Sequence, residues 1–125
     1  MSSFRIFDIA ASAMSVQNAR LNTVASNLAN TDSLSTTPEG TYKARVPVFS
    51  AVVAEDGSAG VRLSRVETSN RPAEARYEPG HPLADEQGYV YAPAINPVEE
   101  MANMISAARS YQNAVDTMAT SRDLM

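Results

Sequence analysis

The sequence predicts an α+β fold in which long N- and C-terminal helices pair as a coiled-coil-like bundle, with a small β-rich region inserted between them. Two observations predict it. All five glycines and all seven prolines lie between residues 38 and 97, so the helix-breaking residues are confined to the middle of the chain. Both flanking segments carry seam residues at alternating steps of three and four, which is the spacing of a coiled coil.

The first helix is expected over residues 1–31, as one half of an assembly core. Its seam consists of Phe7, Ala10, Met14, Gln17, Leu21, Val24 and Leu28. The other faces are nearly uncharged, because Arg5, Asp8 and Arg20 are the only charged residues in this range. A helix with few charges on any side is expected to be buried among several neighbours. It is therefore either half of an intramolecular helical hairpin or an element that packs into a multi-subunit assembly.

Residues 32–96 are expected to form the β-rich middle region with its loops. Alternating side chains indicate a strand within 41–54, and Pro47, which cannot donate to a ladder, makes it an edge strand or interrupts it. The tripeptide Glu-Asp-Gly at 55–57 predicts a turn, and residues 61–68 predict the returning strand of a hairpin. Short strands are expected near 75–77 and at 89–91. The region is expected to project from the helical pair.

The second helix is expected over residues 97–125, as the other half of the assembly core. Asn96 is a good N-cap, Pro97 occupies the first helical position, and Glu99 lies where a capping box places an acidic residue. The seam of this helix consists of Met101, Met104, Ala108, Tyr111, Val115 and Met118. We expect it to pack against the seam of the first helix.

The composition of the 125-residue chain argues against several classes of function. Its length suits one domain. With a net charge of −4 and scattered arginines it has no basic patch for nucleic acid, and without cysteine it has no disulfide or thiolate site. No apolar run approaches the roughly 20 residues of a membrane-spanning helix. No cleaved secretory signal is recognisable, which implies a cytosolic chain or an export route that needs none.

His81 is the one candidate for catalysis or metal binding, with Asp85 and Glu86 nearby in the sequence. It could act as a proton shuttle or a metal ligand. The simpler interpretation is a loop histidine whose hydrogen bond holds an irregular turn, because one histidine without thiols does not make a typical zinc site. The sequence contains no phosphate-binding loop and no nucleophile elbow. We therefore predict no enzymatic activity and no cofactor.

Several motifs resemble those of a known family. The N-terminal pattern Gln17-x-x-Arg20-Leu21-x-x-x-Ala25-x-Asn27-Leu28-Ala29-Asn30 resembles the signature of the flagellar rod and hook axial proteins. The motifs YEPGHP at 77–82, GYVY at 88–91, PVEEM at 97–101 and SYQ at 110–112 are similar to the proximal-rod branch of that family. The resemblance covers nearly the whole chain. Residues 32–37 lie in a variable region, and the last helix of family members usually continues past the position of Met125.

The resemblance implies a structural subunit of the bacterial flagellar basal body. Such subunits are exported unfolded, or partly so, through the flagellar type III apparatus. They polymerise in the periplasm into a helical tube, with both terminal helices in the inner wall and the middle domain outside. The implied partners are further copies of the chain, other rod proteins and the adaptor that joins the rod to the export gate. Contacts of the middle region with surrounding rings are left open. The expected assembly residues are Phe7, Ala10, Met14, Gln17, Arg20, Leu21, Val24, Asn27, Leu28, Asn30, Met101, Met104, Ala108, Tyr111, Val115 and Met118.

Two rival hypotheses make different predictions. A soluble helical-hairpin binding module would be a cooperative helical monomer, whereas a rod subunit is expected to have poorly ordered terminal helices until it assembles. An enzyme centred on His81 would lose function in the variant His81→Ala while still assembling. Under the rod hypothesis, Leu21→Asp or Val115→Asp should abolish assembly.

Overall fold

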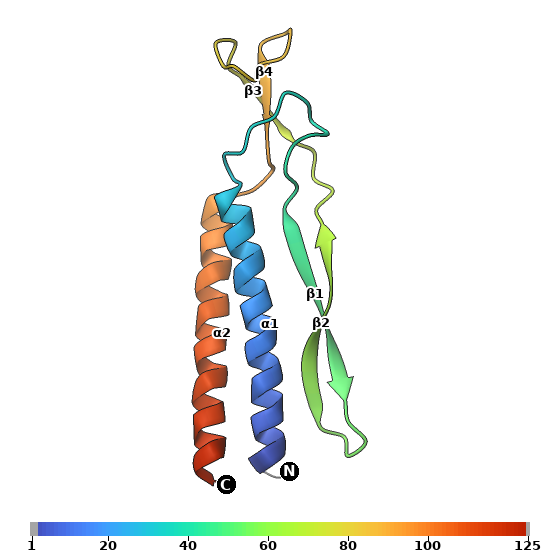
Figure 1. Ribbon diagram of the computed structural model, residues 1–125, viewed down its shortest axis with the longest axis vertical. Helices are drawn as coiled ribbons and strands as arrows, with labels where there is room; N and C mark the ends of the chain where they lie inside the picture. The colour runs from blue at the N-terminus through green and yellow to red at the C-terminus, as the bar shows by residue number, and fades with distance from the viewer. Residues whose placement is uncertain (1–2, 125) are drawn as a thin grey trace.

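The computed structural model describes residues 3–124 and has the predicted α+β fold. The elements are α1 (Ser3–Ala29), β1 (Arg45–Val53), β2 (Ala59–Thr68), β3 (Glu74–Tyr77), β4 (Tyr89–Ala92) and α2 (Pro97–Leu124). Residues 1, 2 and 125, at the ends of the predicted helices, lie outside the described residues. The two helices run antiparallel, so that both ends of the chain lie at the same end of the molecule (Figure 1).

The helical pair is held together along a line of small side chains on α2. Ala107, Ala114 and Ser121 are buried and recur every seven residues, and Ala10 and Val24 are buried on α1. Small side chains let two helix backbones approach closely. Helices of 27 and 28 residues are each roughly 40 Å long, so the pair forms a long rod rather than a rounded core.

The predicted start of α2 is confirmed by its capping geometry. The side-chain oxygen Oδ1 of Asn96 accepts hydrogen bonds from the backbone N–H groups of Val98 at 3.0 Å and of Glu99 at 3.4 Å. These bonds satisfy donors that have no partner inside the helix. Glu99 and Glu100 lie in the first turn, where negative charge complements the helix dipole.

Strands β1 and β2 form the predicted hairpin. They pair antiparallel from Arg45 opposite Thr68 to Val53 opposite Ala59, and the register shifts between Val48 and Phe49. The turn between the strands contains Gly57 with a φ of 88°, a left-handed conformation that favours glycine. The first strand is shorter than the predicted range of 41–54.

The hairpin does not project from the helices as the sequence led us to expect. It lies along α1, on the side of that helix opposite α2 (Figure 1), and α1 contacts both strands. The backbone N–H of Val61 donates to the Ser12 hydroxyl at 3.3 Å, and Arg5 forms an ion pair with Asp56 at the hairpin tip. A two-stranded hairpin alone is marginally stable in water, which explains why it rests on the helix.

Of the two β units, β3–β4 is the one that extends beyond the helices (Figure 1). Strands β3 and β4 pair antiparallel from Glu74 opposite Ala92 to Tyr77 opposite Tyr89, and an isolated bridge joins Ser35 to Tyr91. This unit stands beyond the end of the helical pair that carries the start of α2 (Figure 1). Val90 and Ala92 are fully buried, which gives this small unit a core of its own.

Candidate assembly surface

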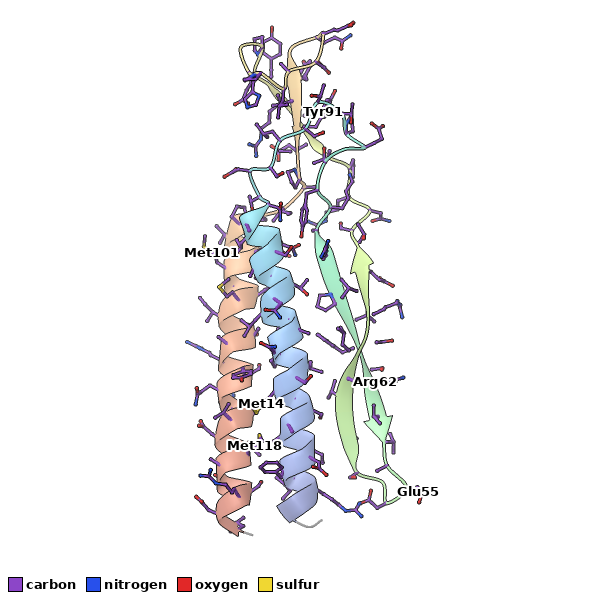
Figure 2. The ribbon with its side chains drawn as sticks, in the orientation of Figure 1. Met14, Glu55, Arg62, Tyr91, Met101 and Met118 are labelled. Carbon is purple, nitrogen blue, oxygen red and sulfur yellow. The ribbon has the colours of Figure 1, made fainter. Side chains whose placement is uncertain are left out.

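The predicted seam of α1 faces the interior of the subunit. None of its seven residues is exposed, and Ala10 and Val24 are buried. At the end of the pair that carries the chain termini, Phe7 and Met14 of α1 line one groove with Val115 and Met118 of α2. Figure 2 shows Met14 and Met118 close to the line where the two helices meet. The structure therefore brings these four predicted residues together.

The seam of α2 differs from the predicted one by about one residue. Ala107 and Ala114 are buried, whereas Ala108 is exposed and Val115 is half-buried. Consecutive helical residues are about 100° apart around the axis. A seam that passes through Ala107 and Ala114 instead of Ala108 and Val115 therefore lies on a different face of α2. The contact with α1 uses Met104, Ala107, Tyr111, Ala114, Met118 and Ser121, which alternate by three and four and are all buried or half-buried.

The first three turns of α2 carry an uncovered row of apolar side chains, and charged residues such as Arg109 and Asp116 follow farther along the exposed side of the helix. Val98, Met101 and Ile105 are 74, 53 and 57% exposed, and Ala108 continues the row. Figure 2 shows Met101 on the outer side of α2. These residues follow steps of three and four, the pattern with which a helix packs against another helix. The row carries no charged side chain.

The hairpin also exposes apolar side chains. Val46, Val52, Val53, Leu63 and Val66 are each at least 40% exposed. Within residues 3–124 the hairpin touches α1 and not α2. The outer row of α2 and the outer surface of the hairpin therefore lie on opposite sides of α1.

The chain exposes more surface than a compact monomer of its size. Its accessible surface is 7887 Å², whereas a compact protein of 13.4 kDa exposes roughly 6,500 Å². The difference of about 1,400 Å² approaches two standard interface patches of roughly 800 Å² each. Neighbouring subunits could bury a surface of that size.

Two polar residues of the N-terminal signature make contacts within the helical pair. The guanidinium of Arg20 donates to the side-chain oxygen of Gln17 and to the hydroxyl of Ser106 on α2, each at 3.4 Å. Asn30 donates to the carbonyl of Ser26 at 2.8 Å, a contact inside its own helix end. Leu21 and Leu28 are half-buried.

Asn27, the most buried polar residue of the signature, has all its partners in its own chain. It is 2% exposed. Its Oδ1 accepts from the backbone N–H of Arg45 at 2.9 Å and from the Tyr42 hydroxyl at 2.8 Å. Its Nδ2 donates to the carbonyl of Arg45 at 3.0 Å and to Oε2 of Glu100 at 3.4 Å.

Sequence reasoning expected several packing neighbours for α1 but did not identify the hairpin as one of them. Ser12 lies against the hairpin tip, and Thr23 borders a groove with Val66. Val16, spaced between them on the same side of the helix, is 4% exposed. The available signal was the shortage of charge on every face of this helix, which indicates more than one packing partner.

The side chains of His81 and Asp85 accept hydrogen bonds from the backbone of their own loop. Nδ1 of His81 accepts a hydrogen bond from the backbone N–H of Leu83 at 3.0 Å, so the histidine holds a turn as an acceptor. Asp85 accepts from the N–H groups of Gln87 and Tyr89 and from the Tyr91 hydroxyl. The N–H of Tyr89 is the main reason why the pKa of Asp85 lies below its ordinary value, and the bond to Asp85 raises the pKa of Tyr91.

Two kinds of feature are absent from residues 3–124. None of these residues form a group of three or more side chains that could hold a metal ion. Neither helix in the described range is long and apolar enough to cross a membrane.

Comparison with known proteins identifies relatives of the whole chain. Residues 7–33 match the family described as flagella basal body rod protein, and residues 86–125 match the flagellar basal body rod FlgEFG protein C-terminal family. The chain is 45% identical to the flagellar basal-body rod protein FlgC of Salmonella typhimurium, over 100% of this chain and 94% of the relative. It is 48% identical to that of Escherichia coli O157:H7, with the same coverage. For Aquifex aeolicus the identity is 40%, over 99% and 92%.

Proposed function

The chain belongs to the FlgC family of flagellar basal-body rod proteins, and on that premise we propose that it polymerises through its two terminal helices. The family is a structural one, and a rod subunit assembles with copies of itself and with other basal-body components. In the proposed mechanism, the helical pairs of successive subunits pack side by side along a helical path. They form the wall of a tube that serves as drive shaft and as export channel.

The observation that carries the proposal is the uncovered apolar row on α2. Val98, Met101 and Ile105 are each more than half exposed, so the pairing with α1 leaves most of their surface uncovered. Apolar side chains in such a row are stabilised when a neighbouring helix covers them, at about 25 cal/mol for each Å² removed from water. The excess accessible surface has the size of two interface patches, one toward each neighbour in a polymer.

The proposed location of the polymer is the periplasmic part of the basal body. The subunit would reach it unfolded, through the flagellar type III apparatus. The fold suits such a route for two reasons. It holds no disulfide, and its helices and strands pack against their neighbours rather than around a large core. Further proposed partners are the adaptor between the rod and the export gate, and the rings around the rod.

The test is Ile105→Asp in a strain that lacks its own copy of the chain. Ile105 is 57% exposed, so the charge should spare the contacts between α1 and α2 within a subunit while it blocks the covering of α2 by a neighbour. We expect loss of rods in isolated basal bodies and loss of swimming. Thr36→Asp, which adds the same charge to an exposed loop, should leave both unchanged. Normal rods with Ile105→Asp would refute the proposed face.

A second test concerns order in the isolated chain. The helical signal in circular dichroism should be weak at low concentration and rise as sedimentation detects assembly. This behaviour follows if neighbours must bury part of the surface that stabilises the helices. Full helicity at every concentration in a chain that sediments as a monomer would instead favour a monomeric binding module.

A further inference from the structure

We propose that Asn27 is a positioning residue, the joint that sets how the hairpin lies along α1 and how both meet the start of α2. One side chain contacts three elements or their immediate flanks. It belongs to α1, bonds the first residue of β1 on both its backbone groups, and reaches Glu100 in the first turn of α2.

The bonding of Asn27 leaves no position on its amide free. A side-chain amide has one oxygen that accepts twice and one nitrogen that donates twice. Here the oxygen accepts from the Arg45 N–H and the Tyr42 hydroxyl, and the nitrogen donates to the Arg45 carbonyl and to Glu100. Asn27 is only 2% exposed. It can therefore influence a neighbouring subunit only indirectly, through the arrangement of the elements in its own subunit.

The two bonds to Arg45 resemble the pairing of a strand. In an antiparallel ladder, opposed residues exchange an N–H and a carbonyl bond. The Asn27 amide makes the same exchange with Arg45, at 2.9 and 3.0 Å. It thus fixes the first residue of β1 against the helix, at the point where the hairpin begins.

Asn27 holds the hairpin at the end opposite its tip, so its bonds affect the orientation of the whole hairpin along α1. Fifteen residues separate Asn27 from Ser12, the helix residue that meets the hairpin tip, a distance of roughly 22 Å along the axis. Near the tip the polar contacts of the hairpin with α1 include a backbone bond to the Ser12 hydroxyl and the exposed Arg5–Asp56 ion pair, and exposed ion pairs contribute little. The buried Asn27 amide, with two bonds to one strand residue, is therefore the stronger of these polar attachments.

The bond to Glu100 extends the joint to the second helix. Nδ2 of Asn27 lies 3.4 Å from Oε2 of Glu100. The loop between α1 and β1 and the loop before α2 both converge here, so one amide coordinates the elements that carry the hairpin surface and the outer row of α2. The consequence for assembly rests on the proposed function, whereas the positioning of the hairpin is independent of it.

An engineered disulfide provides the test, because the chain has no native cysteine. A β-carbon placed on Gly60 would lie 3.7 Å from Cβ of Ser12, within the range of natural disulfides. The variant Ser12→Cys/Gly60→Cys should therefore form an intrachain disulfide when the hairpin is docked. Its rate of formation in the purified full chain under mild oxidant reports docking, with the same chain in urea as the undocked reference.

Into this parent we would introduce Asn27→Ala, with Asn30→Ala as the matched control. Asn30 carries the same amide but bonds within its own helix end. We expect Asn27→Ala to slow disulfide formation about tenfold, the effect of losing the two bonds that hold the backbone of Arg45, and Asn30→Ala to leave the rate unchanged. Equal rates for Asn27→Ala and its parent would overturn the proposal. So would a parent that cross-links no faster than in urea.

A charge-coupled pair separates positioning from general stability. In Asn27→Asp the oxygens can still accept from Arg45 and Tyr42, but the donations are lost and a second carboxylate faces Glu100. Adding Glu100→Gln replaces the carboxylate of Glu100 with an amide, which can donate a hydrogen bond to the new carboxylate at position 27. We expect the rate of Asn27→Asp to rise several-fold when Glu100→Gln is added, while Glu100→Gln alone changes little. No rise would overturn the link to α2. Rods lost in Ile105→Asp with normal cross-linking would leave this inference intact, so the two proposals fail separately.

Discussion

The register of the helical pair makes a prediction that two adjacent alanines can test. Ala107 is fully buried against α1, and Ala108 is exposed. The two residues are identical in chemistry, in helix propensity and in distance from the helix ends. Replacing each in turn by leucine therefore changes only which side of α2 carries the larger side chain.

The expected magnitudes differ because one site has no room. A larger side chain in a packed interface forces its neighbours apart, at a cost of about 1–3 kcal/mol. Ala107→Leu should therefore lower the free energy of unfolding by roughly 2 kcal/mol. An exposed site away from special contacts changes it by less than about 0.5 kcal/mol, which is the expectation for Ala108→Leu.

The assay is urea unfolding followed by the helical signal in circular dichroism, at one fixed protein concentration at which the parent chain is fully helical. With a slope of about 1–3 kcal/mol per molar urea, Ala107→Leu should lower the midpoint by roughly 1 M and Ala108→Leu by less than about 0.4 M. Comparable losses in both variants, or a larger loss in Ala108→Leu, would refute the observed register. The seam first expected from the sequence, through Ala108, would then be favoured.

Two further predictions concern the β3–β4 unit. Gly88→Ala should destabilise the protein by about 1–2 kcal/mol, because Gly88 has a φ of 90° and a β-carbon there would lie 3.0 Å from Tyr77; Gly80→Ala, which meets open space, should leave the urea midpoint unchanged. Because the pKa of Asp85 is lowered from 3.8, its charge stabilises the fold above that pH and the stability is lost as the pH falls through the lowered value. Asp85→Asn should abolish that loss and move the pKa of Tyr91 down toward 10.0, measured by ultraviolet titration against Tyr91→Phe.

Features that depend on neighbouring residues in the sequence could be predicted. The cap of α2 is an example, because Asn96 lies two and three residues from the N–H groups that it accepts. The hairpin turn at Gly57 is another, since a left-handed residue favours glycine. In both, the chemistry that fixes the structure lies within a few residues.

The register of α2 could not be predicted in the same way. Met101, Met104 and Ile105 offer two overlapping seams, and the sequence pattern favours the one with more large side chains. The structure instead pairs α1 with a line of small residues that includes Ala107 and Ala114. Which seam meets α1 depends on how closely the two backbones approach, and that distance is a property of the packed pair rather than of either helix.

The role of Asn27 was beyond sequence reasoning for a different reason. Its main partner is the backbone of Arg45, 18 residues away. A backbone group has no side-chain signature, so nothing in the sequence points from one residue to the other. The same holds for the docking of the hairpin on α1, where the N–H of Val61 meets the Ser12 hydroxyl.

The shortage of charge has a different physical cause on each helix. Charged substitutions are therefore expected to have different effects on α1 and on α2. On α1 one side faces α2 and another faces the hairpin, so its uncharged surface is largely used within the subunit. On α2 only one side is used, and the apolar row through Ile105 remains uncovered. A charge introduced on the α1 seam, as in Leu21→Asp, should therefore unfold the subunit before it can report on assembly. A charge on the outer row of α2 should leave the contacts within the subunit intact and act where neighbouring subunits meet.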